Sequence, residues 1–231
     1  MSREVVDVTY ASACATVRLP WYRLMWRKHW QSQVDLDINR TFRVNRILLR
    51  RSLWNVRVFC CFQSTGYVQG LLFIALPLHK LFRENSVAFW ALVRAFGAVR
   101  PHYGPVVYSV SLGCREDCGC LPAEKVVTVY RRCGAIVPPD LVDVVVSFVR
   151  FRVLCTLGAA ICSDIKSATE ICLFMWRRKL CDKYLCAFAL QFLLCVCGGP
   201  DEEFKHRTNV RLPLQSVRLL LDNVDYVAHL F

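Results

Sequence analysis

The chain has 231 residues, with 30 lysines and arginines against 18 aspartates and glutamates, so its formal net charge is +12. Hydrophobic residues make up 55% of the chain and charged residues 21%, which excludes intrinsically disordered, collagen-like and low-complexity proteins. The mean hydropathy of +0.33 leaves two classes, a compact globular protein and a membrane protein.

The most apolar segments do not have the pattern of membrane-spanning helices. Residues 184–199 fall short of the ~20 consecutive apolar residues that cross a bilayer, and residues 141–162 are interrupted by charged side chains. The N-terminus lacks the apolar stretch of a secretory signal, so the fourteen cysteines are expected to be reduced, mostly as core residues. These features favour a cytoplasmic globular protein over a small membrane protein.

The expected elements of the first hundred residues are helices. Residues 1–20 lack clear periodicity and are expected to be a poorly ordered lead-in. The next segment mixes aromatic and basic residues, with Tyr22, Trp26 and Trp30 four residues apart on one helix face. Core or interface packing is the favoured interpretation of that face, and stacking on single-stranded nucleic acid is the alternative.

Three apolar helices are then predicted over residues 47–62, 67–82 and 85–96. Ser64-Thr65-Gly66 separates the first two, and Pro77 should end or kink the second because proline lacks the backbone N–H of a helix interior. Asn85-Ser86 is a suitable N-cap for the third helix.

Residues 97–124 are predicted to be an irregular insert rich in cysteine, glycine and proline, with a candidate short strand over residues 106–112. Four cysteines lie in or near the insert, but their spacing departs from the paired C-x-x-C pattern of zinc sites. Free thiols are therefore favoured over a zinc site, and the sequence assigns no role to Cys114, Cys118, Cys120 and Cys133.

The C-terminal half, residues 125–231, predicts further helices. The valine-rich residues 141–151 favour a strand by local propensity, and a helix only if tertiary packing overrides it. A capping-box pattern at residues 167–170, and apolar stretches over residues 183–197 and 214–231, predict three helices. The expected fold is all-α: one helical domain over residues 21–231, with an N-terminal half (21–96) and a C-terminal half around the insert.

Two short motifs in the N-terminal half indicate a family. Residues 34–41 fit the pattern I-x-x-D-x-x-R-T with Val34 in the first position, and residues 66–70 fit G-Y-x-Q-G. Ala88-Phe89-Trp90 follows downstream. Together these motifs resemble the TBC-domain family, the all-helical GTPase-activating proteins of Rab GTPases.

The resemblance implies a two-finger mechanism. Arg40 would be the arginine finger that neutralises charge on the phosphoryl oxygens, and Gln69 would orient the attacking water. Asp37 lies one helical turn before Arg40 and can brace the guanidinium or a backbone group. Four further residues would support these side chains: Thr41, Gly66, Tyr67 and Gly70.

The resemblance also sets expectations about partners. The chain would activate a Rab-family GTPase in trans, without catalysing a reaction of its own. GTP and Mg²⁺ belong to the GTPase, so this chain is expected to hold no cofactor. Its expected location is the cytoplasm, with peripheral association with endomembranes and a role in vesicle traffic, and no nucleic-acid partner is expected.

The sequence departs from the family pattern at several positions. The R-x-x-x-W element is absent, since Arg23 and Trp26 are only three residues apart. Arg43 and Leu71 replace residues that are often proline and methionine, and Arg177 stands where an aspartate follows the tryptophan. These departures indicate a highly diverged or truncated member.

Alternatives remain open at this stage. Asp37 and Arg40 would also fit an ordinary surface ion pair, and Gln69 a residue that caps or solvates a helix start. The chain as a whole would also fit a non-catalytic TBC-like interaction module or a small membrane-associated helical protein. The charge of +12 and the N-terminal aromatic residues raise nucleic-acid binding as a further alternative.

Overall fold

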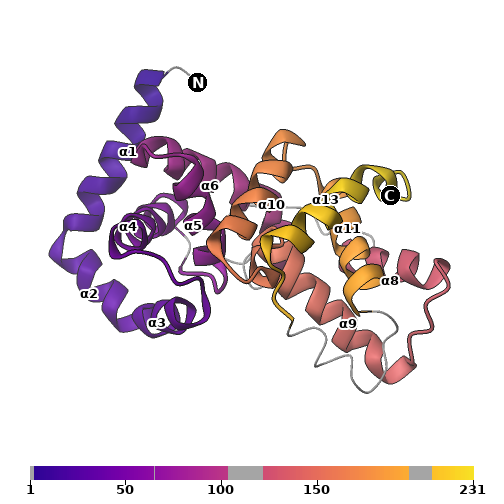
Figure 1. Cartoon of the computed structure of the whole chain (residues 1–231). Coiled ribbons are helices and arrows are strands. Elements are labelled where there is room, and N and C mark those ends of the chain that lie inside the picture. Colours follow the sequence, from indigo (N-terminus) through magenta and orange to yellow (C-terminus); the bar gives the residue numbers. More distant parts are fainter. Residues whose placement is uncertain (1–2, 65, 104–121, 198–209) are drawn as a thin grey trace. The chain divides into compact units, whose positions relative to one another are not determined.

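The computed structural model in Figure 1 describes residues 3–64, 66–103, 122–197 and 210–231. Within these residues the elements are helices, and the β interactions amount to an isolated bridge between Cys162 and Leu212. The predicted all-α fold class is therefore confirmed. The described chain divides into a first unit, which contains residues 3–64 and 66–97, and a second unit, which contains residues 98–103, 122–197 and 210–231.

The first unit is built around a buried central helix pair. Helices α4 and α5 pack against each other, and α1 packs against α4. Apolar side chains such as Phe59, Ile74 and Phe89 have no exposed surface, and full burial of such a side chain contributes roughly 1.5–3 kcal/mol. The helices are α1 (Arg3–Arg18), α2 (Pro20–His29), α3 (Gln31–Arg40), α4 (Arg46–Gln63), α5 (Leu71–Leu81) and α6 (Asn85–Val99), which continues past the unit boundary.

The expectation of a poorly ordered lead-in over residues 1–20 is wrong, because residues 3–18 form helix α1. Ala13 and Val17 are buried on one face of α1, and the Tyr10 hydroxyl donates a hydrogen bond to Asn55 Oδ1 in α4 at 3.0 Å. Packing against α4 therefore stabilises a helix whose own sequence shows no clear periodicity.

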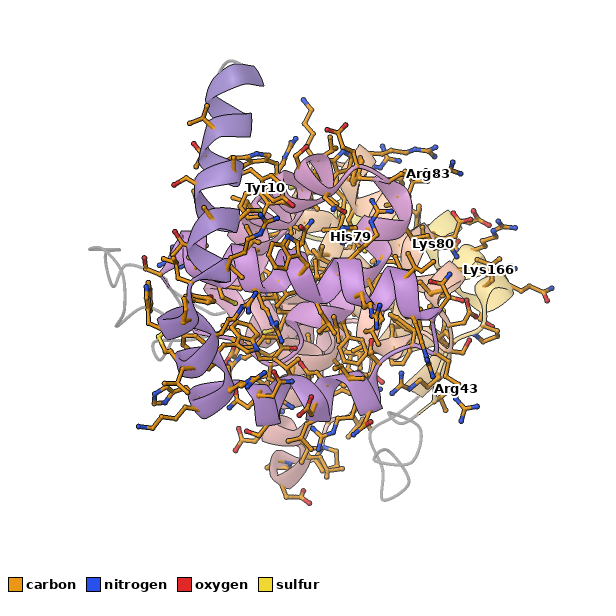
Figure 2. All side chains as sticks on the ribbon, turned by 90° about the vertical axis from the view of Figure 1, so that its left-hand side faces the viewer. Tyr10, Arg43, His79, Lys80, Arg83 and Lys166 are labelled. Carbon is orange, nitrogen blue, oxygen red and sulfur yellow. The ribbon has the colours of Figure 1, made fainter. Side chains whose placement is uncertain are left out.

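A buried polar network joins four of these helices. Asn55 Nδ2 donates to the Asn85 carbonyl oxygen at 2.7 Å and lies 3.2 Å from His79 Nε2. With the Tyr10 contact, the network joins α1, α4, α5 and α6; Tyr10 and His79 are labelled in Figure 2. Burial lowers the pKa of His79 to about 4, so its imidazole is neutral at pH 7 and can accept a hydrogen bond from the Asn55 amide.

Helix α5 differs from the predicted helix at its start, because it does not include Tyr67. It begins at Leu71 because residues 66–70 form a loop, and Pro77 lies inside it without ending it. Residues 71–79 are all buried, so tertiary packing offsets the backbone hydrogen bond that Pro77 cannot donate.

The second unit is assembled from helices interrupted by tighter or wider turns. Helix α11 packs against α8 and α13, and α10 packs against α13. Its α-helices are α8 (Pro122–Arg132), α9 (Val142–Phe148), α10 (Ile165–Arg177), α11 (Asp182–Phe192) and α13 (Leu214–Ala228). Its short 3₁₀ and π turns are η1 (Arg100–Tyr103), η2 (Pro139–Leu141), η3 (Val149–Val153), η4 (Leu154–Thr156), η5 (Ala159–Ile161) and η6 (Leu193–Cys197).

Tertiary packing decides the ambiguous valine-rich segment. Val145, Val149 and Val153 are spaced four apart, and each has no exposed surface. A helix buries all three on one face, whereas strand propensity alone would have left the choice open. The segment is therefore helical through α9 and η3.

The predicted capping box at residues 167–170 does not start a helix. Helix α10 begins at Ile165, and its N-cap is Asp164, whose carboxylate accepts from the backbone N–H groups of Lys166 and Ser167 at 2.7 and 3.0 Å. Asp164 is the stronger cap because its charge also suits the positive end of the helix.

The insert predicted over residues 97–124 lies largely outside the described residues, including its candidate strand over residues 106–112. At its described ends, Arg100–Tyr103 forms the turn η1 and α8 begins at Pro122. In the described part of the chain, no helix combines the length and the apolar character needed to cross a bilayer.

Candidate functional site

Helix α3 carries the first motif and ends at Arg40. Val34 and Asp37 lie on the same face, three residues apart, and both are 1% exposed. Thr41 has an extended backbone (φ −88°, ψ −166°), which ends the helix although its N–H still bonds to the Asp37 carbonyl oxygen at 2.9 Å. Arg40, the residue before Thr41, is consequently the last residue of the helix, and it is exposed.

The second motif forms the loop between α4 and α5, and both of its glycines have a structural reason. A Cβ atom at Gly66 would lie 2.6 Å from Nε1 of Trp30, too close for any side chain. Gly70 is the N-cap of α5 and has φ +92°, a left-handed conformation that favours glycine. The backbone conformation therefore favours glycine at position 70, and the Trp30 side chain favours glycine at position 66.

The Asp37 carboxylate joins the two motifs. Its Oδ2 atom accepts hydrogen bonds from the Tyr67 hydroxyl at 2.6 Å and from the Gly70 backbone N–H at 2.7 Å. Burial, and then the Asp37 charge, raise the pKa of Tyr67 far above its usual range, so the phenol stays a donor. Two charge-assisted hydrogen bonds thus fix the last turn of α3 to the loop before α5.

Arg40 and Gln69 are exposed at the two sides of this junction. Arg40 lies three residues after Asp37, a rise of about 4.5 Å along the helix axis, and Gln69 is the residue before Gly70. Both side chains therefore leave the backbone close to the same buried carboxylate. The surface-ion-pair interpretation of Asp37 is wrong, because that carboxylate is buried, and Gly70 rather than Gln69 is the N-cap of α5.

Aromatic side chains pack around the junction. The Phe42 and Phe73 rings meet edge to face at 5.7 Å, and the Trp26 ring meets the Tyr67 ring at 6.3 Å. Tyr22 and Trp26 are 3% and 2% exposed, which confirms the packing interpretation of the predicted aromatic face. These contacts pack the loop residue Tyr67 against the Trp26 side chain of α2.

Sequence reasoning missed the partners that hold the loop. Trp30 appeared only as one member of an aromatic face, yet its indole contacts Gly66. No local sequence signal indicates that contact, because the two residues come together only when the junction of α2 and α3 packs against the loop. The predicted support residue Thr41 has a buried hydroxyl for which the described part of the structure provides no hydrogen-bond partner.

Among the described side chains, no group of three or more histidine, cysteine, aspartate or glutamate residues could hold a metal ion. Cys133 is an exposed free thiol, while Cys114, Cys118 and Cys120 lie outside the described residues. The choice between free thiols and a zinc site for these four cysteines therefore stays a prediction.

Comparison with known families agrees with the motif geometry. Residues 21–103 match the family model of the Rab-GTPase-TBC domain. This segment is similar to the TBC-domain family. The match includes both motifs and the Asp37 junction, and it spans less than half of the chain. No curated protein and no solved structure shows significant similarity to the chain.

The TBC domain is a GTPase-activating domain of Rab GTPases, so the family indicates a Rab-type partner and an activator that acts in trans. Within this TBC segment, the exposed groups at the junction are a permanent cation and a carboxamide. A guanidinium can bridge two anionic oxygens, and a carboxamide can both donate to and accept from a water molecule. These two groups suit the chemistry of phosphoryl transfer to water.

Proposed function

We propose that this chain accelerates GTP hydrolysis by a Rab-type GTPase, with Arg40 and Gln69 supplied in trans as its two fingers. The observation that carries the proposal is the pair of hydrogen bonds from Tyr67 and Gly70 to Asp37. They hold two exposed side chains from separate segments at one junction. A surface organised in this way can present both groups to a nucleotide bound by another protein.

In the proposal, Arg40 neutralises negative charge as the γ-phosphoryl group is transferred. An arginine finger accelerates hydrolysis by about 10³–10⁵, which corresponds to roughly 4–7 kcal/mol of transition-state stabilisation. Arginine suits this role because its planar fork bridges two oxygens and keeps its charge. The position at the C-terminal end of α3 also suits a cation, because the helix dipole is negative there.

Gln69 orients the attacking water in the proposed mechanism. Its carboxamide oxygen can accept a hydrogen bond from the water, and its NH₂ group can donate one to a phosphoryl oxygen. The two hydrogen bonds align the water for in-line attack. The Gly70 N–H bond to Asp37 holds the residue next to Gln69, so the carboxamide begins from a fixed backbone position. GTP and Mg²⁺ are bound by the GTPase in this mechanism, and the chain associates peripherally with endomembranes that carry the GTPase.

Single-turnover GTP hydrolysis across a panel of Rab GTPases tests the proposal. We expect the purified chain to accelerate at least one of them, and Arg40→Ala to remove about 10³-fold of that acceleration. Arg40→Lys should recover little, because an ammonium lacks the bridging fork. Arg50→Ala is the matched control, since Arg50 is an exposed arginine on α4 whose loss changes the net charge equally.

Gln69→Ala tests the second finger in the same assay. We expect a loss of about 10²-fold or more in the hydrolysis rate while the affinity for the GTPase is retained, because the side chain acts on the water rather than on docking. A chain that binds a Rab GTPase without accelerating it would instead be a non-catalytic interaction module. Unchanged hydrolysis in the Arg40→Ala variant would contradict the finger assignment.

A further inference from the structure

The first unit contains a cavity between α1, α2 and α4, and neither Arg40 nor Gln69 lines it. The cavity has a volume of about 230 Å³ and a polar and aromatic lining. Val17 comes from α1, and Trp54 and Arg57 come from α4. The remaining lining residues are on α2: Tyr22, Arg23, Trp26 and Arg27.

Positive charge is concentrated in this cavity. Arg23, Arg27 and Arg57 line it, and the guanidinium of Arg18 lies 5.7 Å from the centre of the Trp54 ring. The Arg57 guanidinium lies 5.3 Å from the centre of the Trp26 ring, which holds it in a cation–π contact. Burial, and then the nearby charges of Arg27 and Arg23, lower the pKa of Arg57, although an arginine stays protonated.

The protein supplies little negative charge against these guanidiniums. Asp35 is the carboxylate whose charge acts on Arg57, but in the described ranges Arg23, Arg27 and Arg57 form no salt bridge with a carboxylate. The Arg57 guanidinium makes one long hydrogen bond, of 3.4 Å, to Gln31 Oε1. Like charges gathered in a cavity repel one another, and an anion from outside the chain would relieve that repulsion. The arrangement therefore fits a ligand better than it fits a purely structural cluster.

We propose that this cavity binds a compact polyanion that carries two or more phosphate groups. Guanidinium forks match phosphate oxygens bidentately, and the three lining arginines require more than one negative charge for neutralisation. A cavity of about 230 Å³ has room for a small phosphorylated group, while an extended acidic peptide needs an open groove. A phosphoinositide headgroup and a soluble inositol phosphate share this chemistry.

The cavity shares one packing residue, Trp26, with the surroundings of the proposed GTPase site, but it is not part of that site. Trp26 lines the cavity on one side and packs against Tyr67, whose hydroxyl bonds to Asp37. The proposal does not depend on the GTPase-activating function, because none of the cavity residues is a finger or a motif residue. Its test therefore measures binding alone.

The test uses the full chain with inositol 1,4,5-trisphosphate as the soluble probe in isothermal titration calorimetry. We expect saturable binding, and a loss of affinity of roughly tenfold or more in the double variant Arg23→Ala/Arg27→Ala, since each charge-assisted contact removed costs about a factor of ten. Arg57→Lys keeps the charge and loses the fork, and we expect it to weaken binding as well.

The matched control is Arg43→Ala/Arg46→Ala, which removes two exposed arginines outside the cavity; Arg43 is labelled in Figure 2. We expect this control to keep its affinity within about twofold, because screened charges at a distance contribute little. Circular dichroism melting of all variants separates lost binding from lost folding. An equal loss in the control and cavity variants, or no saturable trisphosphate binding, would overturn the proposal.

Vesicles distinguish the two sources of the phosphate group. Phosphatidylcholine vesicles with and without phosphatidylinositol 4,5-bisphosphate should both be tested. Phosphoinositide-dependent sedimentation that is lost in Arg23→Ala/Arg27→Ala supports the cavity and assigns it to a lipid headgroup. Trisphosphate binding without such sedimentation supports the cavity and assigns it to a soluble ligand. Binding to an acidic peptide with no response to trisphosphate would contradict the proposed ligand class.

Discussion

Removal of the Asp37 carboxylate would leave two buried donors, the Tyr67 hydroxyl and the Gly70 N–H, without their acceptor. A hydrogen bond to a charged group contributes about 1.5–3 kcal/mol. We therefore expect Asp37→Ala to lower the free energy of unfolding by roughly 3 kcal/mol, measured by urea denaturation. Asp37→Asn keeps one acceptor oxygen and should cost less.

The functional readout of this change is the GTP hydrolysis assay. Because Asp37 holds the junction from which both fingers leave, Asp37→Asn should reduce acceleration more than it reduces affinity for the GTPase. Asp35→Ala is the control, since Asp35 is an exposed carboxylate on the same helix. Full activity and full stability in Asp37→Ala would show that the junction does not position the fingers.

The motif pattern predicted Asp37 as a brace but left open what it braces. In the structure, the Asp37 carboxylate binds the Tyr67 hydroxyl and the Gly70 N–H. That pairing could not be read from the sequence, because the two segments are separated by helix α4 and meet only through its packing. The roles of Arg40 and Gln69 as fingers remain predictions for the hydrolysis assay.

At the scale of helices, the buried network of Tyr10, Asn55, His79 and Asn85 connects elements that the sequence treats separately. Its amide and imidazole groups are satisfied only when α1, α4, α5 and α6 are all in place. A satisfied buried network of this kind specifies one packing arrangement, since any slip leaves polar groups unpaired.

The network also makes stability depend on pH. His79 has a pKa of about 4 in the folded chain, against 6.5 for an ordinary histidine. Between pH 4 and pH 6.5 this histidine binds a proton in the unfolded chain but not in the folded chain. The contribution of neutral His79 to stability is therefore complete above about pH 6.5 and is lost as the pH falls towards 4. The pKa difference corresponds to a loss of about 3 kcal/mol at most.

The measurement is urea unfolding at pH 7 and at pH 4.5, for the original chain and for His79→Gln. The original chain should lose more stability than the variant between the two pH values, because glutamine does not titrate. Carboxylates contribute equally to both chains and cancel in the comparison. An identical pH dependence in the two chains would mean that His79 is not held neutral by the fold.

Element prediction succeeded where the local pattern and the tertiary environment agree, and it was wrong where they differ. Helix α4 was predicted from its apolar stripe. Helix α1 was missed because its order depends on α4, and Pro77 does not end helix α5, which continues to Leu81 in buried surroundings. Residues 67–70 were assigned to that helix because the bond from Gly70 to Asp37 is not local.

For the whole molecule, the state of the cysteines is a testable consequence of the core. Cys60 and Cys172 are buried free thiols, and burial raises the pKa of Cys172 to about 12. Cys133 and Cys181 are exposed free thiols. Since the thiolate is the reactive form, we expect iodoacetamide at pH 8 to label the exposed pair at least tenfold faster than the buried pair.

Mass spectrometry of the labelled peptides reads each cysteine separately, and the unfolded chain in urea is the control in which all thiols react. Equal labelling rates in the native chain would show that the core opens on the timescale of the reaction. The expectation that burial protects the core thiols would then be wrong.

Tertiary packing decides where the basic side chains of the chain gather. A net charge of +12 favours anionic partners in general, but a charge excess does not reveal where the cations gather. Only the packing of α1, α2 and α4 brings Arg23, Arg27 and Arg57 to one cavity. Arg57 is separated from the other two by α3, so no local pattern contains the cluster.

The sequence by itself determined the helical class of this protein and the similarity of residues 21–103 to the TBC-domain family, because apolar periodicity and two short motifs are local properties of the chain. The tertiary structure decided the partners of Asp37, the order of α1 and the cavity of arginines. Each of these depends on groups that are distant in sequence, and such groups acquire an interaction energy only when packing brings them within contact distance.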